Sequence, residues 1–223
     1  MTKNRSQTQQ KPLRRQTVRS DRKLPAAFYQ RPTKIVARDL IGKVLCHKID
    51  GRVLSGIITE TEAYLGIRDS ACHTYRGRRT DRNASMYLEG GHSYVYFIYG
   101  IHHCFNVVTL DESQPEAVLI RAIEPLAGID EMRKRRKLSA GKSNREIGSG
   151  PGKLCQALGI DRSCDGVSLS KNEIWIEDPL SPESFRIVAG PRVGIDYAME
   201  PASKPARDWP LRFVRALPRE KKP

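Results

Sequence analysis

The pattern of apolar and polar residues along the chain predicts strands more often than helices. The clearest signal is a pair of apolar runs, VLCHKI and RVLSGIITETEAY, on either side of Asp50-Gly51. An Asp-Gly pair between two such runs is typical of a β-hairpin. Further strand-like runs, several of them rich in β-branched residues or tyrosine, span residues 93–99, 104–110, 117–123, 174–176, 185–188 and 211–214.

Three short helices are predicted between these strands. Residues 33–41 carry apolar side chains at roughly helical spacing, with a proline before them and a glycine after them. Residues 128–138 form a basic segment of helical character, and residues 152–158 follow Ser149-Gly150-Pro151. Helices among mainly antiparallel strands make an α+β fold, and 223 residues suit a single mixed domain.

The net charge of the chain predicts a polyanionic binding partner. The chain has 39 Lys and Arg against 25 Asp and Glu, a net charge of +14, which favours nucleic acid over an acidic membrane surface. Residues 1–23 are basic and nearly free of large apolar groups, so we expect a disordered basic arm followed by one folded domain over residues 24–223. The arm either touches phosphates nonspecifically or serves only as a solubilising tail.

The cysteines and the apolar runs bear on the compartment. Five cysteines, no secretory signal and no run long enough to cross a bilayer predict reduced thiols in the cytosol or nucleus and no contact with membranes.

Candidate chemistry begins in ITETEAYLG. On an ideal strand Glu60, Glu62 and Tyr64 share one face, with neighbours about 6.8 Å apart. Inverting glycosidases separate two carboxyls by roughly 6.5–9.5 Å, but two groups on one strand approach a substrate from the same side. One glutamate is therefore expected to act and the other to be structural, while a solvated strand face without chemistry is the alternative.

The tyrosine-rich segment HSYVYFIYGIHHCFN allows two interpretations. Tyr94 and Tyr96 share a strand face, and Tyr99 precedes Gly100, where the chain can turn tightly. Aromatic residues are good strand formers, so packing in the core is one interpretation. Beside a turn they also suit stacking on bases or wedging into a duplex, which is the other. Asn106 either bonds nearby backbone or reads a base edge.

The histidines and cysteines do not have the spacing of a metal site. Cys72-His73 and His102-His103-Cys104 are adjacent residues, and no C-x₂-C or H-x₃-H frame exists. We therefore predict no metal, a stacking or hydrogen-bonding role for His73, and surface or hairpin positions for His102 and His103.

Cationic side chains concentrate in the loop RGRRTDRN and at the start of the helix in SGPGK. The candidates for phosphate contacts are Arg76, Arg78, Arg79, Arg82 and Lys153. A helix start rich in small residues can bind phosphate on free amides, although an ordinary capped helix explains SGPGK equally well. The segment lacks the P-loop pattern.

Taken together and in this order, the sequence motifs indicate one protein family. They are ETEAYLG with His73 beyond it, RGRRTDRN, SMYLEGG, YVYFIYGIHHCFNVV, VLIRAIEPL, SGPGKLCQALGI, RVGID and PLRF. From about residue 24 to the C-terminus, the chain resembles the alkyladenine (3-methyladenine) DNA glycosylase family, the mammalian type that also occurs in bacteria. The resemblance implies a curved, mainly antiparallel sheet with peripheral helices and a protruding β-hairpin.

The resemblance also implies an activity. The family removes alkylated or deaminated purines from double-stranded DNA by flipping the base and hydrolysing the N-glycosidic bond. It needs no cofactor or metal, works without lyase activity because water is the nucleophile, and is expected to act as a monomer. A bacterial member would work at the nucleoid in the cytoplasm, and a eukaryotic one in the nucleus.

The family's functional residues fall on matching positions of this chain. Glu62 corresponds to the general base, Arg121 to the arginine that holds the water and the carboxylate, and Val193 to the main-chain water contact. The walls of the base pocket fall on Tyr64, His73 and Tyr96. The asparagine that excludes guanine falls on Asn106, and the intercalating tyrosine on Tyr99.

One departure and three rivals accompany this interpretation. After Gly100 the chain has Ile101-His102-His103 in place of more aromatic residues, so the surface beside the wedge differs. The rivals are a DNA-damage-binding module without catalysis, a metal-dependent nuclease using His73, His102 and His103, and an RNA-binding protein that fits the charge alone. Intact Glu62 and Arg121 argue against the first.

Overall fold

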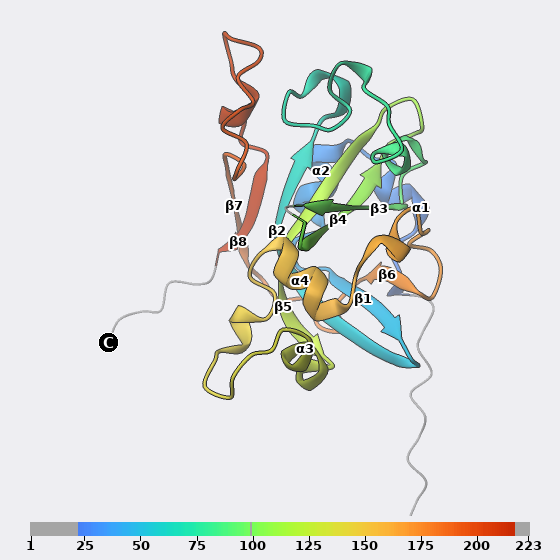
Figure 1. The fold of residues 1–223 in the computed structure, drawn as a ribbon, viewed down its shortest axis with the longest axis vertical. Coiled ribbons are helices and arrows are strands. Elements are labelled where there is room, and N and C mark those ends of the chain that lie inside the picture. The colour runs from blue at the N-terminus through green and yellow to red at the C-terminus, as the bar shows by residue number, and fades with distance from the viewer. Residues whose placement is uncertain (1–21, 99, 217–223) are drawn as a thin grey trace, which may run out of the picture.

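One curved sheet organises the chain (Figure 1). The computed structural model describes residues 22–98 and 100–216. The strands are β1 (Val44–Ile49), β2 (Arg52–Tyr64), β3 (Ser93–Ile98), β4 (His102–Thr109), β5 (Glu116–Ala127), β6 (Ile174–Glu177), β7 (Arg186–Gly190) and β8 (Arg212–Ala216). Their order is β3-β4-β5-β2-β1-β6, with β8 pairing with β2 and β7. All these pairs are antiparallel, which confirms the predicted α+β fold with a mainly antiparallel sheet.

Short helices lie around the sheet. They are α1 (Ala26–Tyr29), α2 (Thr33–Asp39), α3 (Ile129–Arg135) and α4 (Pro151–Leu158). The three predicted helices are confirmed, although α2 and α3 are shorter than predicted, and α1 was not predicted. Among the described residues, no helix is both long enough and apolar enough to cross a membrane. The predicted basic arm lies outside the described residues, apart from its last two positions.

The long strand β2 is the centre of the sheet. Its turn from β1 has positive φ at both Asp50 (49°) and Gly51 (76°), as the turn of a two-residue hairpin requires. The first half of β2 pairs with β1, and Glu60–Glu62 pairs instead with β8, while β5 follows the other edge of β2. The ITETEAY segment is therefore flanked by strands on both sides.

Two bulges interrupt the pairing of β2 with β5 next to the glutamates. Ile58 pairs with Ile123 and Glu60 with Ala122, so Thr59 is the additional residue on β2. Thr61 then pairs with Ile120, which leaves Arg121 as the additional residue on β5. Bulges redirect side chains and are frequent next to active sites. Here one of them places Arg121 beside the glutamates.

Alternate residues of β2 separate the core from the site. Ile58, Thr61 and Ala63 are fully buried, and the Thr61 hydroxyl donates to the carbonyl oxygen of Ala37 in α2 at 2.7 Å. These side chains belong to the face that α2 covers. Glu60, Glu62 and Tyr64 share the other face, as predicted. On that face Arg121 donates to both glutamates, and the Tyr64 hydroxyl donates to Glu62.

The connection between β2 and β3 is long, and its end is fixed by backbone contacts. The amide of Gly90 donates to the carbonyl oxygen of Leu110 at 2.8 Å, and that of Gly91 donates to Val108 at 2.9 Å. A β-carbon at position 90 would lie 2.7 Å from the Leu110 oxygen and 3.0 Å from the Tyr29 oxygen. Glycine is therefore required where this segment, which carries His73, rejoins the sheet.

We expect Gly90→Ala to lower the free energy of unfolding by about 1–3 kcal/mol, because backbone must move to accept the methyl group. Urea denaturation measures the change. Gly141→Ala is the matched control, since a β-carbon at 141 meets nothing within 4 Å, and its effect should stay within about 0.5 kcal/mol. Equal stabilities of the two variants would contradict the close contact.

Candidate functional site

A cavity of about 320 Å³ brings the predicted site residues together. It lies among β2, β3, β4, β5, the segment around residue 72 and the loop of residues 193–197. Of the predicted residues, it is lined by Tyr64, His73, Arg82, Tyr96, Asn106, Arg121 and Val193. A larger cavity of about 440 Å³, between residues 28–57 and 178–215, contains none of them. Chemistry, and not size, therefore identifies the smaller cavity as the site.

Glu62 lies beneath this cavity with its side chain fully buried. Three donors hold the carboxylate. The Tyr64 hydroxyl donates to Oε2 at 2.9 Å, the Val193 amide donates to Oε1 at 2.8 Å, and Arg121 Nη1 donates to Oε2 at 3.3 Å. A buried charge needs such partners, since an unpaired one costs several kcal/mol. The carboxylate is therefore fixed in orientation directly behind residues that line the cavity.

Glu60 has a defined role that the sequence did not reveal. Its Oε1 accepts hydrogen bonds from Arg121 Nε at 2.8 Å and from Arg212 Nε at 2.6 Å. Burial alone would lower the pKa of Arg121, but the carboxylates of Glu62 and Glu60 outweigh it and raise that pKa. Glu60 therefore holds the guanidinium that contacts Glu62, and the two glutamates differ in their contacts.

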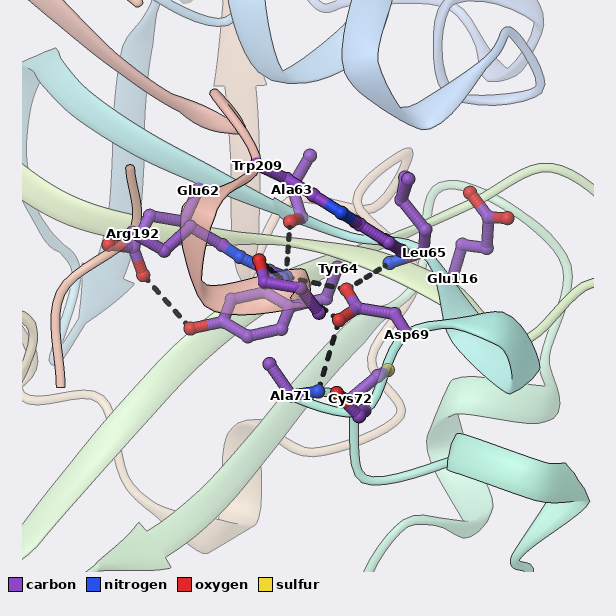
Figure 2. A network of polar contacts seen from close by, with 12 residues as sticks. Glu62, Ala63, Tyr64, Leu65, Asp69, Ala71, Cys72, Glu116, Arg192 and Trp209 are labelled. Atoms are coloured by element: carbon purple, nitrogen blue, oxygen red, sulfur yellow. Dashed lines mark hydrogen bonds and ion pairs between the residues drawn. The ribbon is translucent and has the colours of Figure 1, made fainter. Parts of the chain in front are cut away.

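Tyr64 connects Glu62 to a second buried ion pair (Figure 2). Its hydroxyl donates to Glu62, and the guanidinium carbon of Arg192 lies 4.7 Å from its ring centroid. Arg192 donates to Asp69 through two bonds, Nη1 to Oδ2 at 2.5 Å and Nη2 to Oδ1 at 2.8 Å. Burial, and then the charge of Glu62, raise the pKa of Tyr64 well above its usual value, so the hydroxyl keeps the proton that it donates.

An aromatic wall faces Tyr64 from the β3 side of the cavity. His73 meets Tyr96 edge to face, with ring centroids 4.7 Å apart, and its Nδ1 lies 2.8 Å from the Tyr94 hydroxyl. Burial raises the pKa of Tyr94, and this hydroxyl has no other hydrogen-bond partner among the described residues. Tyr94 therefore donates to Nδ1, which leaves the proton of His73 on Nε2.

His73 is neutral at physiological pH in this setting. Burial, together with the charges of Arg82 and Arg78, lowers the pKa of His73 to about 4. The cavity thus has a neutral imidazole with an N–H donor, next to an electron-rich phenol ring.

Asn106 bonds neighbouring backbone, which is one of its two sequence-based interpretations, and it also lines the cavity. Its Nδ2 donates to the carbonyl oxygen of Tyr94 at 2.9 Å, so the side chain is bonded to neighbouring backbone. It also lines the cavity, with only 4% of its surface exposed. The backbone bond fixes the amide in one orientation at the cavity wall.

The predicted phosphate-binding residues are all exposed but differ in their contacts. Arg78 and Arg82 line a cavity of about 290 Å³ that adjoins the main one. Arg79 lies over the ring of Tyr87, and Lys153 lies in the first turn of α4. Arg76 is paired with Glu200 at 2.7 Å, which makes it the least available of the five.

The turn between β3 and β4 is the segment in which the sequence predicts the wedge residue. Tyr99 itself lies outside the described residues. Beside it, Ile101 is 71% exposed, and a β-carbon at Gly100 would meet nothing within 4 Å. His102 is exposed and His103 packs on Phe97 with ring centroids 4.9 Å apart, as expected of hairpin residues. Gly100 and Ile101 are therefore open to solvent at this turn.

Sequence reasoning missed several residues of the site. The structure adds Asp69, Arg192, Tyr94 and Tyr197, of which the last two line the cavity. Arg192 immediately precedes Val193 in the GPRVGID segment. The only feature of the sequence that could have marked Arg192 as a site residue is that it is an arginine among small residues. Nothing in the sequence pairs it with Asp69, because the two residues lie 123 positions apart.

Comparison with known proteins places the chain in one family. The sequence model of the methylpurine-DNA glycosylase (MPG) family matches residues 27–217. A protein of Desulfitobacterium hafniense (strain Y51) named "Putative 3-methyladenine DNA glycosylase" is 48% identical over 197 residues, which cover 86% of this chain and 94% of that protein. Proteins of the same name from Clostridium acetobutylicum and Bdellovibrio bacteriovorus are 47% and 48% identical, over 86% and 85% of this chain and 93% of each relative.

The low pKa of His73 predicts a pH-dependent loss of stability. Between about pH 6.5 and pH 4 the unfolded chain binds a proton at this histidine and the folded chain does not, so acidification favours unfolding. In His73→Gln, the free energy of unfolding should fall less over this range, by on the order of 2–3 kcal/mol. Urea denaturation at pH 7 and pH 4.5 measures the difference. The exposed His102→Gln is the control, and identical pH profiles for wild type and His73→Gln would refute the assignment.

Proposed function

Because the chain belongs to the methylpurine-DNA glycosylase family, we propose that it removes alkylated and deaminated purines from double-stranded DNA through a water activated by Glu62. The observation that carries the proposal is the buried Glu62 carboxylate, held by Tyr64, Arg121 and Val193 directly behind an aromatic cavity. An N-glycosidic bond in a duplex is inaccessible unless the nucleotide rotates out of the stack, at a cost of a few kcal/mol.

The cavity suits one flipped purine. Its volume of about 320 Å³ and its lining of Tyr64, His73 and Tyr96 provide aromatic surfaces for a flat base. Electron-rich rings attract the positive charge of an alkylated purine by roughly 0.5–2 kcal/mol. Asn106, held by its bond to the Tyr94 carbonyl, would crowd the exocyclic amine of guanine and so disfavour the normal base. The attraction of the rings for a positively charged base would offset this cost for 7-methylguanine.

In the proposed reaction, Glu62 polarises a water for attack at C1′ and stabilises the positive charge that develops on the sugar. Arg121, aligned by Glu60, orients the carboxylate and the water. The Val193 amide and the Tyr64 hydroxyl restrict the carboxylate to one orientation, which limits reorganisation during the reaction.

The leaving base needs different help in the two substrate classes. An alkylated purine already carries positive charge and leaves unaided. A neutral purine such as hypoxanthine gains negative charge as it leaves. His73 lines the cavity, and its Nε2–H is proposed as a donor to that base. A neutral donor can stabilise that charge without repelling a cationic base.

The surface around the cavity would bind the duplex. Arg78, Arg79, Arg82 and Lys153 are the proposed phosphate contacts, and the net charge of +14 supports nonspecific binding that allows the protein to search DNA. Tyr99, at the tip of the hairpin between β3 and β4, would enter the minor groove and replace the flipped nucleotide. We propose that the protein acts as a monomer, without cofactor or lyase activity, at the bacterial nucleoid.

The proposal is tested with two glutamates of the same strand. Glu62→Gln should keep affinity for a duplex with a single lesion but lose base release by at least about 100-fold, because general base catalysis contributes on that scale. Glu60→Gln should lose less, since it weakens only the support of Arg121. Single-turnover base release and equilibrium binding on the same 7-methylguanine duplex measure both effects.

Two outcomes would overturn the proposal. Appreciable turnover by Glu62→Gln would show that another group activates the water. Lesion binding by the wild-type protein without any base release would favour the alternative of a non-catalytic DNA-damage-binding module.

A further inference from the structure

The ring of Tyr64 already has a cation on one face. The guanidinium carbon of Arg192 lies 4.7 Å from the ring centroid. The Arg192 side chain is fully buried and does not line the cavity, whereas Tyr64 does. The guanidinium therefore occupies the face of the ring that is turned away from the cavity, and the rest of the ring remains for a bound base.

Asp69 neutralises this cation at close range (Figure 2). Its two oxygens accept the two bonds from Arg192, and both side chains are fully buried. Backbone amides of Leu65 and Ala71 also donate to the Asp69 carboxylate, at 2.9 and 3.0 Å. The carboxylate is thus fixed on both sides by groups that cannot move independently of β2 and the turn after it.

We propose that Asp69 determines specificity by screening Arg192, so that Tyr64 can accept a positively charged base on its cavity face. The inference rests on the proposed function, in which Tyr64 is a wall of the base pocket. A base stacked on Tyr64 would lie roughly 8 Å from the guanidinium. Two unit charges at that distance, in an effective dielectric constant of about 20, repel strongly enough to weaken binding roughly 30-fold.

The consequence differs between substrate classes. A cationic alkylpurine feels an unscreened Arg192, whereas neutral hypoxanthine in the same pocket does not. A purely structural role of the ion pair would change the binding of both bases together. The ratio of the two affinities therefore separates screening from support of the fold.

The test uses the Glu62→Gln background, so that bound substrates are not consumed. Two duplexes that differ only in one base, 7-methylguanine or hypoxanthine, carry different fluorophores and compete for the protein. The competition gives the affinity ratio independently of the fraction of folded protein. The variants are Asp69→Asn and the double variant Asp69→Asn/Arg192→Gln. Asp165→Asn is the matched control, because Asp165 also pairs with an arginine (Arg162) and accepts an amide (Val95) but does not line the cavity.

Asp69→Asn should lower the ratio of cationic to neutral affinity by about 10- to 30-fold. The double variant, which removes the cation as well, should return to the ratio of the parent protein, as should Asp165→Asn. If Asp69→Asn does not fold, Arg192→Gln decides: it leaves the Asp69 carboxylate without its cation, so screening predicts a raised ratio of cationic to neutral affinity, and an unchanged ratio contradicts it. An unchanged ratio in folded Asp69→Asn overturns the inference. Loss of all preference for lesions in the parent protein would instead overturn the proposed function.

Discussion

The fold depends on satisfying one fully buried carboxylate, that of Glu62. Taking such a group out of water costs several kcal/mol unless partners replace its hydration. The three donors come from three different parts of the chain, namely Tyr64 on β2, Arg121 on β5 and Val193 after β7. The sheet order, with β5 on one edge of β2 and β8 on the other, brings these parts together.

The second buried pair, Asp69–Arg192, connects the same parts. Arg192 precedes Val193, donates to the carbonyl oxygen of Ala63 at 2.9 Å and lies against the ring of Tyr64. It therefore contacts both residues that follow Glu62 on β2. The position of the Val193 amide, and with it one of the bonds to Glu62, depends on this ion pair. Electrostatics and geometry at the site are consequently linked through one arginine.

Much of this arrangement could be predicted from the sequence. Strand alternation placed Glu60, Glu62 and Tyr64 on one face, and the Asp-Gly turn predicted the β1–β2 hairpin, because both features follow from local backbone geometry. The same-side argument predicted one acting and one structural glutamate, and the structure shows different contacts for the two. The resemblance to a family then selected Glu62 and the residues that line the cavity.

The remainder depends on contacts between distant parts of the chain. The bulge at Arg121 cannot be read from apolar periodicity, and the pairing of Glu60 with Arg212 spans 152 positions. The hydrogen bond from Tyr94 to His73 required knowing that β3 approaches the turn after β2. The sequence left open whether Tyr94 packs in the core or stacks on bases, and the structure buries it.

The central claim is that a water beside Glu62, and not an amine of the protein, attacks the sugar. The most direct measurement is borohydride treatment during turnover of a duplex with one 7-methylguanine. An amine nucleophile forms a Schiff base that borohydride converts into a permanent link. The account predicts complete base release, an intact abasic strand and no covalent protein–DNA adduct. An adduct that accumulates with base release would contradict it.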